Sequence, residues 1–586
     1  MNTIDSKILL TEKFHQLGDW LAALDPIAVP PVEYPPVDPE DPNPPVMHGF
    51  HTAVCPDRNG DLVEYAFYIP RTYRHSGNSL IVVGDNGQTA RGMFEANDWA
   101  GLLEKYETAA YFVTPNDSWS EEDQLDDLLH ILRGPYANVR SCRWYASNYD
   151  AVYAIGLGTG AALASLMGVL FSHTFAAFAA LGNAAISPEL LEIIGKLPTA
   201  DETERKAEVA IPAWIGNASG KAGPLVDYLK HACGVKEENL RNDLALVWRA
   251  HENTKRLCLN DQPVAEVWYS TEVISVNDAV IDRMLDFVTG YKRWGGYGNG
   301  HIRKTIRPED CGLIRREITC GGLKRHWYVF EPTAYRKGLK KDFPMVMAIH
   351  GYSCHGAFYM ENSSWQAVAE ERGIIVVFPS GYPQTSPRSG LSPTGAWNSF
   401  ARPLPDRTDD LTFLRQVVEI MEADYPIDKH RVYVTGHSNG SAMTQNLMRF
   451  APELFAAFAG IGAMEAAMFE GKIAPPMPND LPRPVWYIMG ERDLFEADTL
   501  AEGSGNLNTV KNACKVNGAD YDGASHYTSG IYRHLVAYDG QHRPMVRFTG
   551  ADKWPHTVTP ETSLMIWDEF FCKFVRNDDG TVTYIG

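Results

Sequence analysis

The pentapeptide Gly436-His-Ser-Asn-Gly440 contains the residue best suited to covalent chemistry, Ser438. Residues 431–435 before it prefer β-strands, and residues 441–450 after it favour a helix. Strand, sharp turn and helix form the setting in which a G-x-S-x-G serine projects its hydroxyl from a sheet edge. Glycine on each side lets strand and helix approach without Cβ clashes. The pattern predicts Ser438 as a nucleophile, with the backbone amide of Asn439 facing the oxyanion that its attack would create.

A serine hydroxyl attacks only when a base removes its proton, and the base needs a carboxylate to fix its tautomer. After a nucleophile elbow the acid comes first in the sequence and the histidine second. Asp493 follows the buried-strand run 484–489, where the active edge of a parallel sheet would lie. We predict Asp493 as the acid, with Glu491 and Glu496 as nearby alternatives.

The base should follow the last strand of the sheet. Residues 545–548 have the composition of that strand, and His556 comes shortly after them, before a helix expected near Pro560. We predict His556 as the base. The segment 494–544 between acid and base is predicted to be a long insertion that acts as a lid. Three histidines of that segment are expected on the surface or in the lid: His526, His534 and His542.

A second oxyanion donor is expected in the loop 350–355, which follows the strand-like run 344–349. We expect the backbone of Tyr352 or Ser353 to contribute this donor. A thiol-histidine site formed by His350 and Cys354 is an alternative, but no elbow surrounds Cys354.

Strand and helix signals alternate along the chain, which indicates an α/β fold with mostly parallel sheets covered by helices. The sequence also contains a repeat. Residues 152–160 match residues 432–440, and residues 175–179 are identical to residues 455–459. Both matches have the same displacement, since 432 − 152 and 455 − 175 both equal 280. We infer two tandem α/β-hydrolase domains that arose by duplication.

The first copy lacks the residues that the chemistry needs. Gly158 stands at the position of the nucleophile, Ser219 or a neighbour at that of the acid, and Val273 at that of the base. We therefore expect the first domain to be catalytically degenerate and to serve as scaffold, dimer surface or a wall of the active site.

Three regions are predicted along the chain: an N-terminal helix with a proline-rich arm over residues 1–46, the degenerate domain over 47–298, and the catalytic domain over 299–586. The prolines of residues 29–45 exclude helix and ladder and favour an extended linker, or an arm that clasps a partner subunit. Homo-oligomerisation through this arm or the degenerate domain is a hypothesis. A hairpin is expected over residues 313–331.

The composition excludes several classes of partner. The formal net charge of −20 argues against nucleic acid and anionic membranes, which both require clustered basic residues. No stretch approaches the roughly 20 apolar residues of a membrane span. The first residues lack the features of a signal peptide, so we expect a cytoplasmic protein, or a secreted one if a leader was removed.

The cysteines predict no metal site. The nine cysteines include no C-x-x-C pair and are expected to be reduced. Cys311 with Cys320 is the pairing left open for a disulfide. No cofactor is implied.

Beyond these motifs, the second half resembles the poly(3-hydroxybutyrate) depolymerase-like esterases of carbohydrate esterase family 1, which include feruloyl and acetyl-xylan esterases. The resemblance covers about residues 320–575. It rests on His350-Gly351, Ser364-Trp365, Val377-Phe-Pro379, Ala396-Trp-Asn398, Asp409-Asp410 with Phe413-Leu414, the elbow, and Leu454-Phe-Ala-Ala457.

The resemblance implies a serine esterase with an acyl-enzyme intermediate. Trp397 and Trp554 are expected to form aromatic walls of the acyl pocket. His437 is a third candidate for the substrate pocket; it adjoins the nucleophile in sequence, and the strained turn directs it away from the serine hydroxyl. Asp409 and Asp410 would be structural and cap the helix that starts near Leu411.

The expected substrates are small hydroxycinnamoyl-type or short-chain acyl esters, with hydroxybutyrate oligomers as an alternative. Two other readings stay open: a serine peptidase and a non-catalytic scaffold.

Overall fold

The structure is a computed structural model. It describes residues 37–41, 48–56, 62–73, 77–85, 87–113, 147–198, 204–216, 220–235, 240–250, 265–294, 301–384, 393–399, 408–464, 481–493, 500–558 and 561–586. The N-terminal helix predicted over residues 4–24 lies outside these ranges, as does the proline-rich arm except for residues 37–41.

The chain divides into two compact units, with the boundary between Thr305 and Ile306. β12 (His301–Lys304) pairs with β11 (Tyr291–Trp294) of the first unit, so the boundary lies slightly beyond the predicted 298/299. Residues 37–41 belong to the second unit, where the Lys324 amide donates to the Pro39 carbonyl at 2.9 Å.

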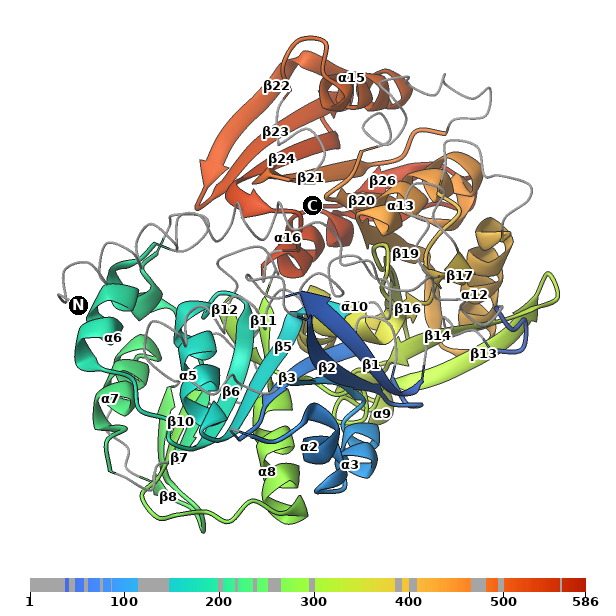
Figure 1. Cartoon of the computed structure of the whole chain (residues 1–586). Helices are drawn as coiled ribbons and strands as arrows, with labels where there is room; N and C mark the ends of the chain where they lie inside the picture. Colours follow the sequence, from blue (N-terminus) through green and yellow to red (C-terminus); the bar gives the residue numbers. More distant parts are fainter. Residues whose placement is uncertain are drawn as a thin grey trace. The chain divides into compact units, whose positions relative to one another are not determined.

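The second unit is built on a ten-stranded sheet, coloured from yellow-green to red in Figure 1. Its five neighbouring pairs from β16 to β24 are parallel, and both edges are antiparallel. In spatial order its strands are β13 (Ile314–Cys320), β14 (Leu323–Phe330), β16 (Ile375–Pro379), β15 (Phe343–Ile349), β19 (Ile427–His437), β20 (Ala457–Ile461), β21 (Val485–Arg492), β24 (Pro544–Pro555), β23 (Tyr532–Asp539) and β22 (Ala519–Ser529).

Helices connect these strands and shield the sheet. They are α9 (Thr333–Arg336), α10 (Gly356–Ser363), α11 (Trp365–Arg372), α12 (Asp410–Asp424), α13 (Asn439–Phe450), α15 (Gly505–Asn517) and α16 (Thr562–Glu569). Two small hairpins, β17 (Pro383–Gln384) with β18 (Thr394–Gly395) and β25 (Phe574–Arg576) with β26 (Val582–Tyr584), complete the unit.

The first unit contains a second ten-stranded sheet. Its spatial order is β1 (Gly49–Pro56), β2 (Leu62–Ile69), β4 (Thr108–Val113), β3 (Gly77–Val83), β5 (Ser147–Gly158), β6 (Phe175–Gly182), β7 (Ala213–Gly216), β10 (Ala265–Ser270), β9 (Leu246–Ala250) and β8 (Leu240–Arg241). Its helices are α2 (Ala90–Glu95), α3 (Trp99–Lys105), α5 (Gly160–Leu170), α6 (Pro188–Lys196), α7 (Gly223–Ala232) and α8 (Asp278–Thr289).

The two sheets have the same strand order. In each sheet, the third and fourth strands of the sequence exchange places, so that the third lies nearer the centre of the sheet. The last three strands of the sequence follow in reverse order, which places the final one next to the centre and the earliest of them at the edge. A buried detail is also repeated: the Trp214 indole donates to Ser270 Oγ at 3.0 Å, and that of Trp486 donates to Thr549 Oγ1 at 2.8 Å. Both sheets have the α/β-hydrolase arrangement, and their equivalence supports the predicted duplication.

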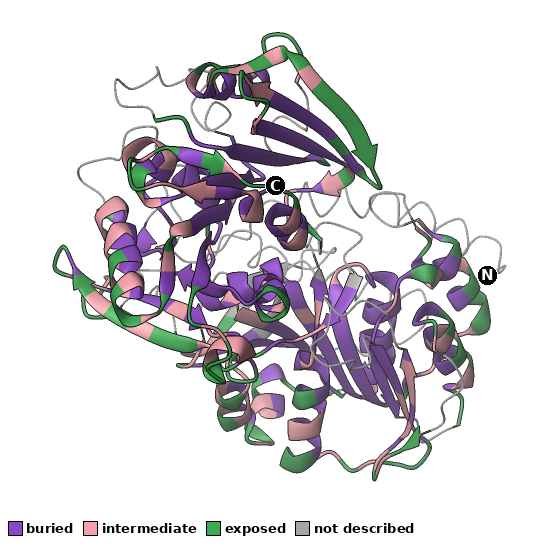
Figure 2. Ribbon diagram, turned by 180° about the vertical axis from the view of Figure 1, so that it is seen from behind, coloured by how far each residue is buried: buried purple, intermediate pink, exposed green. Residues whose placement is uncertain are grey.

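The central strands form the cores of the two units. Every residue of β15 and of β4 is buried, as expected for apolar strands covered on both faces. Figure 2 shows the same pattern, with buried central strands and helices whose outer sides are exposed. The predicted hairpin is confirmed, because β13 and β14 pair antiparallel from Ile314 with Val329 to Cys320 with Leu323.

The predicted lid over residues 494–544 is wrong for its described part. Residues 500–544 form α15, β22 and β23, and the two strands extend the sheet beyond β24. Residues 494–499 lie outside the described residues. The prediction for His534 is also wrong, because its ring is buried between Ser529 Oγ at 2.9 Å and Thr549 Oγ1 at 2.8 Å. His526 and His542 are exposed, as predicted.

Two further observations concern the described residues alone. Cys311 and Cys320 are both buried, and no disulfide joins them. None of the described helices combines the length and the apolar character that crossing a membrane would need.

Candidate active site

The turn at Ser438 has the strained backbone of a nucleophile elbow. β19 ends at His437, Ser438 adopts φ 54° and ψ −119°, and α13 begins at Asn439. A Cβ on Gly436 would lie 2.3 Å from the Gly440 carbonyl oxygen. A Cβ on Gly440 would lie 2.3 Å from the Ile349 carbonyl oxygen. Glycine is therefore required at both positions, and the close contact fixes the serine at the sheet edge.

The structure brings the three predicted catalytic side chains together. The Ser438 hydroxyl lies 2.8 Å from His556 Nε2, and His556 Nδ1 lies 2.7 Å from Asp493 Oδ1. Asp493 follows β21 and His556 follows β24, and these neighbouring strands are parallel, so their carboxyl ends meet at one edge. In this geometry Nδ1–H donates to the carboxylate, which leaves Nε2 to accept the serine proton.

Of the two alternative acids, Glu491 is directed elsewhere, because it accepts a hydrogen bond from the Lys553 amide at 2.5 Å. Glu496 lies outside the described residues. The Asp493 side chain is only 1% exposed and that of His556 is 9% exposed. Since low exposure strengthens an electrostatic interaction, this carboxylate is well suited to hold an imidazolium.

His437 lies beside the imidazole of His556. The centroids of the two rings are 4.8 Å apart, and His437 Nε2 is buried with no hydrogen-bond partner among the described residues. Burial, together with the neighbouring His556, holds the pKa of His437 well below its usual value. His437 therefore packs as a neutral ring against the base, and its place in the substrate pocket stays a prediction.

The loop after β15 is organised by His350. Its Nδ1 lies 2.6 Å from the Gly351 carbonyl oxygen, and its Nε2 accepts the Gly381 amide at 2.8 Å. Burial lowers the pKa of His350 to about 4, and the charge of Arg325 acts in the same direction. The ring is therefore neutral, and its two bonds require the proton on Nδ1.

This histidine orients a predicted oxyanion donor. In a trans peptide the carbonyl and the N–H point in opposite directions. Because His350 holds the Gly351 carbonyl, it also fixes the direction of the Tyr352 amide. The Ser353 amide instead donates to the Gly395 carbonyl at 3.0 Å, which removes it as a donor in this arrangement. Of the two predicted alternatives, the geometry favours Tyr352.

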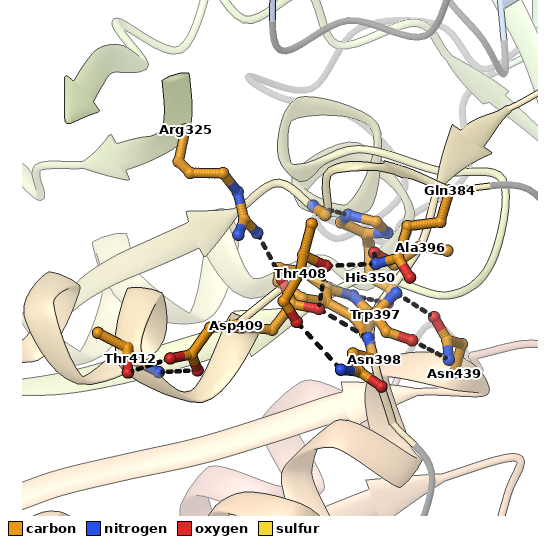
Figure 3. Close-up of polar contacts among 12 residues, drawn as sticks. Arg325, His350, Gln384, Ala396, Trp397, Asn398, Thr408, Asp409, Thr412 and Asn439 are labelled. Carbon is orange, nitrogen blue, oxygen red and sulfur yellow. Dashed lines mark hydrogen bonds and ion pairs between the residues drawn. The ribbon is translucent and has the colours of Figure 1, made fainter. Parts of the chain in front are cut away.

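The Asn439 side chain holds the segment that carries Trp397 (Figure 3). Its Oδ1 accepts the Trp397 amide at 2.7 Å, and its Nδ2 donates to the Trp397 carbonyl at 3.3 Å. The Trp397 indole donates to the His350 carbonyl at 2.9 Å and is 2% exposed. The prediction of Trp397 as a wall of the acyl pocket is wrong, because its ring is buried core under the elbow.

A buried ion pair supports the same segment. Arg325 on β14 donates to Asp410 Oδ1 at 2.7 Å, and both side chains are at most 2% exposed. Asp410 Oδ2 accepts the Asn398 amide at 2.6 Å. Asp409 is the N-cap of α12, accepting the Thr412 amide at 3.0 Å, as Figure 3 shows. Capping is thus confirmed for Asp409, whereas Asp410 has a different structural role.

Trp554 remains a predicted pocket residue. Its side chain is partly buried, and its indole N–H has no partner among the described residues. A Cβ on Gly490 would lie 2.3 Å from the Trp554 carbonyl oxygen, so β21 and this segment are in close contact. The segment leads directly to His556 and therefore fixes the position of the base.

Sequence reasoning missed the supporting roles of three residues: His350, the Asn439 side chain and Arg325. The sequence presents His350 in the motif His350-Gly351 and in the thiol-histidine alternative, and neither indicates its bonds to Gly351 and Gly381. The side-chain amide of Asn439, next to the predicted nucleophile, was visible in the sequence. No signal identifies its partner, because Trp397 lies 42 residues away in sequence.

The structure describes two of the three positions at which the first unit is predicted to lack a catalytic residue. Gly158 occupies the turn between β5 and α5 with φ 57°, close to that of Ser438, and Val273 is 73% exposed. Ser219 lies outside the described residues. Within the described ranges of the whole chain, no three His, Cys, Asp or Glu side chains are grouped so that they could hold a metal ion.

Comparisons with known proteins give partial matches. The chain is similar to a bifunctional acetylxylan esterase/xylanase from Neocallimastix patriciarum, with 28% identity over 172 residues, 28% of this chain and 22% of that protein. Acetylxylan esterase A from Aspergillus ficuum is 32% identical over 141 residues, 23% of this chain and 42% of that protein.

A third relative is a poly(3-hydroxyalkanoate) depolymerase C from Paucimonas lemoignei, 32% identical over 125 residues, 21% of this chain and 28% of that protein. The matches thus span less than half the length of each of these relatives. No protein-family model matches the chain. These are the groups of esterases that the sequence motifs resemble.

Proposed function

We propose that the second unit is a serine carboxylic-ester hydrolase that works through an acyl-enzyme. The observation that carries this proposal is the continuous relay from Ser438 Oγ to His556 at 2.8 Å and from His556 to Asp493 at 2.7 Å. Such a relay activates a serine hydroxyl for nucleophilic attack near neutral pH. A serine with a purely structural role needs no histidine and carboxylate arranged in this way.

In the proposed reaction, Ser438 Oγ attacks the ester carbonyl carbon while His556 Nε2 takes its proton. Asp493 keeps the imidazole in the required tautomer and stabilises its positive form. Collapse of the tetrahedral intermediate breaks the bond to the alcohol, which leaves with the proton from His556. Water then enters, His556 removes its proton, and the acyl group is released as a carboxylic acid.

The negative charge of the tetrahedral oxygen needs donors that are already in position. We assign this role to the backbone amides of Asn439 and Tyr352. Asn439 begins α13, so the partial positive charge of the helix N-terminus acts in the same direction. The carbonyl held by His350 supports the choice of Tyr352.

For the substrate we propose small hydroxycinnamoyl-type or short-chain acyl esters. The relatives support an ester substrate, since two are acetylxylan esterases by name and one is a polyhydroxyalkanoate depolymerase. Trp554 is the remaining candidate for an aromatic contact with the acyl group.

The test is turnover of a panel of p-nitrophenyl acyl esters and methyl hydroxycinnamates by wild type and by Ser438→Ala. The wild type should hydrolyse members of the panel, and the variant should lose roughly 10⁴- to 10⁶-fold in kcat. Retained activity in a folded Ser438→Ala protein would refute the proposal. A preference for hydroxybutyrate oligomers would keep the triad but change the substrate class.

A fluorophosphonate probe separates the enzyme from a silent scaffold. The probe reacts with activated serines, so it should label wild type and spare Ser438→Ala. Absence of labelling in wild type would favour the scaffold. Cleavage of a peptide panel with no ester turnover would favour the peptidase.

A further inference from the structure

A short buried segment of the second unit contacts both elements that carry the proposed oxyanion donors. It consists of residues 395–399 and is called the bridging segment below. The Trp397 indole donates to the His350 carbonyl at 2.9 Å, and the Ser353 amide donates to the Gly395 carbonyl at 3.0 Å. These two bonds lie on either side of the predicted donor in the loop after β15. The bridging segment therefore holds that loop at both ends.

The Asn439 side chain holds the bridging segment at the start of α13 (Figure 3). Its Oδ1 accepts the Trp397 amide at 2.7 Å, and its Nδ2 donates to the Trp397 carbonyl at 3.3 Å and to the Ser399 hydroxyl at 2.5 Å. Asn439 and Trp397 are both buried. Because water does not readily replace buried hydrogen bonds, removal of this amide would leave the Trp397 peptide groups without these partners.

Other contacts leave the bridging segment little freedom to move by itself. Asp410 Oδ2 accepts the Asn398 amide at 2.6 Å. A Cβ on Gly395 would lie 2.4 Å from the Cys354 carbonyl oxygen, so the segment lies directly against the loop after β15. In a closely packed interior, a shift of one such segment displaces its neighbour.

These contacts form a continuous path from one donor to the other. Asn439 supplies the first donor with its backbone amide, while its side chain fixes Trp397. Trp397 holds the His350 carbonyl, and the centroids of their rings are 5.0 Å apart. His350 in turn holds the Gly351 carbonyl at 2.6 Å, which directs the Tyr352 amide. The residue that supplies one donor thus also fixes the direction of the other.

The relative position of the two donors matters chiefly in the transition state. Each donor must lie about 2.7–3.1 Å from the place where the oxyanion forms, before the reaction begins. The oxyanion does not exist in the bound ester, so a misplaced donor weakens the transition state more than the substrate complex. Loss of such an interaction lowers kcat and leaves KM nearly unchanged.

We propose that the Asn439 side chain is a positioning group that sets the separation of the two oxyanion donors through Trp397 and His350. A smaller residue at this position would supply the same backbone amide but would leave the Tyr352 amide less well oriented. This inference rests on the proposed esterase function and adds a specific residue to it.

The experiment measures steady-state hydrolysis of p-nitrophenyl acetate by the full chain and two variants. Asn439→Ala keeps the backbone amide and removes all three side-chain bonds. Trp397→Phe keeps an aromatic ring and removes the bond to the His350 carbonyl. Each should lower kcat roughly tenfold or more with KM within about twofold, since complete loss of one oxyanion donor costs about 10²–10³ in kcat.

Inhibition by phenethyl trifluoromethyl ketone tests the donors directly. Ser438 Oγ adds to the carbonyl carbon of this ketone, the serine proton passes to His556 Nε2, and the carbonyl oxygen becomes an oxyanion. Its Ki should rise in both variants by about the factor by which kcat/KM falls, because the adduct resembles the transition state. The alcohol formed by reducing this ketone makes no oxyanion, and its Ki should change by no more than about twofold.

A double variant and a matched control separate positioning from general loss of stability. If Asn439 acts through His350, Asn439→Ala should lower kcat by no more than about threefold in a His350→Gln background. Trp486→Phe removes an indole donor from an equally buried tryptophan of the same unit, which bonds to Thr549 Oγ1 at 2.8 Å. This control should leave kcat within about twofold of wild type, because Trp486 has no hydrogen bond to the bridging segment.

Thermal unfolding shows which variants are folded, and Trp397→Phe keeps the test decisive if Asn439→Ala misfolds. Three outcomes would overturn this inference alone, in an active wild type: unchanged kcat in the folded variants, an equal loss of kcat in Trp486→Phe, and full multiplication of the effects of Asn439→Ala and His350→Gln. A wild type that neither hydrolyses esters nor reacts with a fluorophosphonate would instead refute the proposed function.

Discussion

At the scale of single residues, the candidate site depends on neutral histidines as much as on the catalytic one. His350 is fully buried, donates to Gly351 and accepts from Gly381. His437 packs against His556 as a neutral ring. The order of Ser438, Asp493 and His556 made the triad predictable from sequence alone. The roles of the other two histidines were not, since each depends on partners that only the folded chain supplies.

Substitution of His350 by glutamine should reduce catalysis without abolishing it. The Gly351 carbonyl would lose its rigid donor, and the Tyr352 amide would lose its fixed direction. We expect kcat for p-nitrophenyl acetate to fall roughly 10- to 100-fold with little change in KM, because loss of one oxyanion donor costs about 10²–10³. Steady-state kinetics test this, and an unchanged kcat would exclude a positioning role for His350.

The same residue makes stability depend on pH. The pKa of His350 is about 4 in the folded chain and 6.5 as its ordinary value. Between these values the unfolded chain binds the additional proton, so stability must fall as pH decreases through this window. Protonation of His350 in the unfolded chain should lower the free energy of unfolding by about 2 kcal/mol between pH 7.5 and pH 5. Urea unfolding at pH 7.5 and pH 5 should show a smaller loss for His350→Gln, and equal losses would contradict the assignment.

At the scale of elements, the site is supported by the link between β14 and α12. Arg325 and Asp410 form a buried pair, and the second oxygen of Asp410 holds the Asn398 amide beside Trp397. The hairpin that carries Arg325 was predicted from sequence, because its strands are close along the chain. The β22–β23 hairpin was mistaken for a lid, since polar residues on an exposed strand resemble a loop in composition.

Adjacent aspartates allow a matched test of this link. Asp410→Ala leaves the Arg325 charge buried without its partner, which should cost about 3–5 kcal/mol. Asp409→Ala removes only the cap of α12 and should cost about 1 kcal/mol. The urea midpoint for loss of esterase activity, measured for both variants, reports on the second unit. Similar midpoints for the two variants would show that the buried pair does not stabilise this unit.

At the scale of the whole molecule, one sheet arrangement occurs twice with different residues at its active edge. The repeat was predictable because residues 175–179 are identical to residues 455–459. The loss of the serine at Gly158 was also visible in the sequence. The Asp85 carboxylate occupies the space beside Gly158, where a Cβ would lie 2.5 Å from the Asp85 Cγ. This was not visible in the sequence, because Asp85 lies 73 residues earlier in the chain and reaches Gly158 only through the pairing of β3 with β5.

The close approach of Asp85 to Gly158 predicts how substitutions at these two positions should combine. Gly158→Ser places a Cβ 2.5 Å from the Asp85 Cγ and should destabilise the first unit. Adding Asp85→Gly leaves a glycine beside the new serine, as Gly351 lies beside Ser438 in the second unit, and should recover part of the loss, with a coupling energy of roughly 0.5–3 kcal/mol. Hydrogen exchange in β5 measures both effects. In a Ser438→Ala background neither variant should hydrolyse esters, because the exposed Val273 stands where the catalytic base is predicted. Additive destabilisation would show that the two side chains do not compete for one space, and recovered hydrolysis would show that the first unit retains a base.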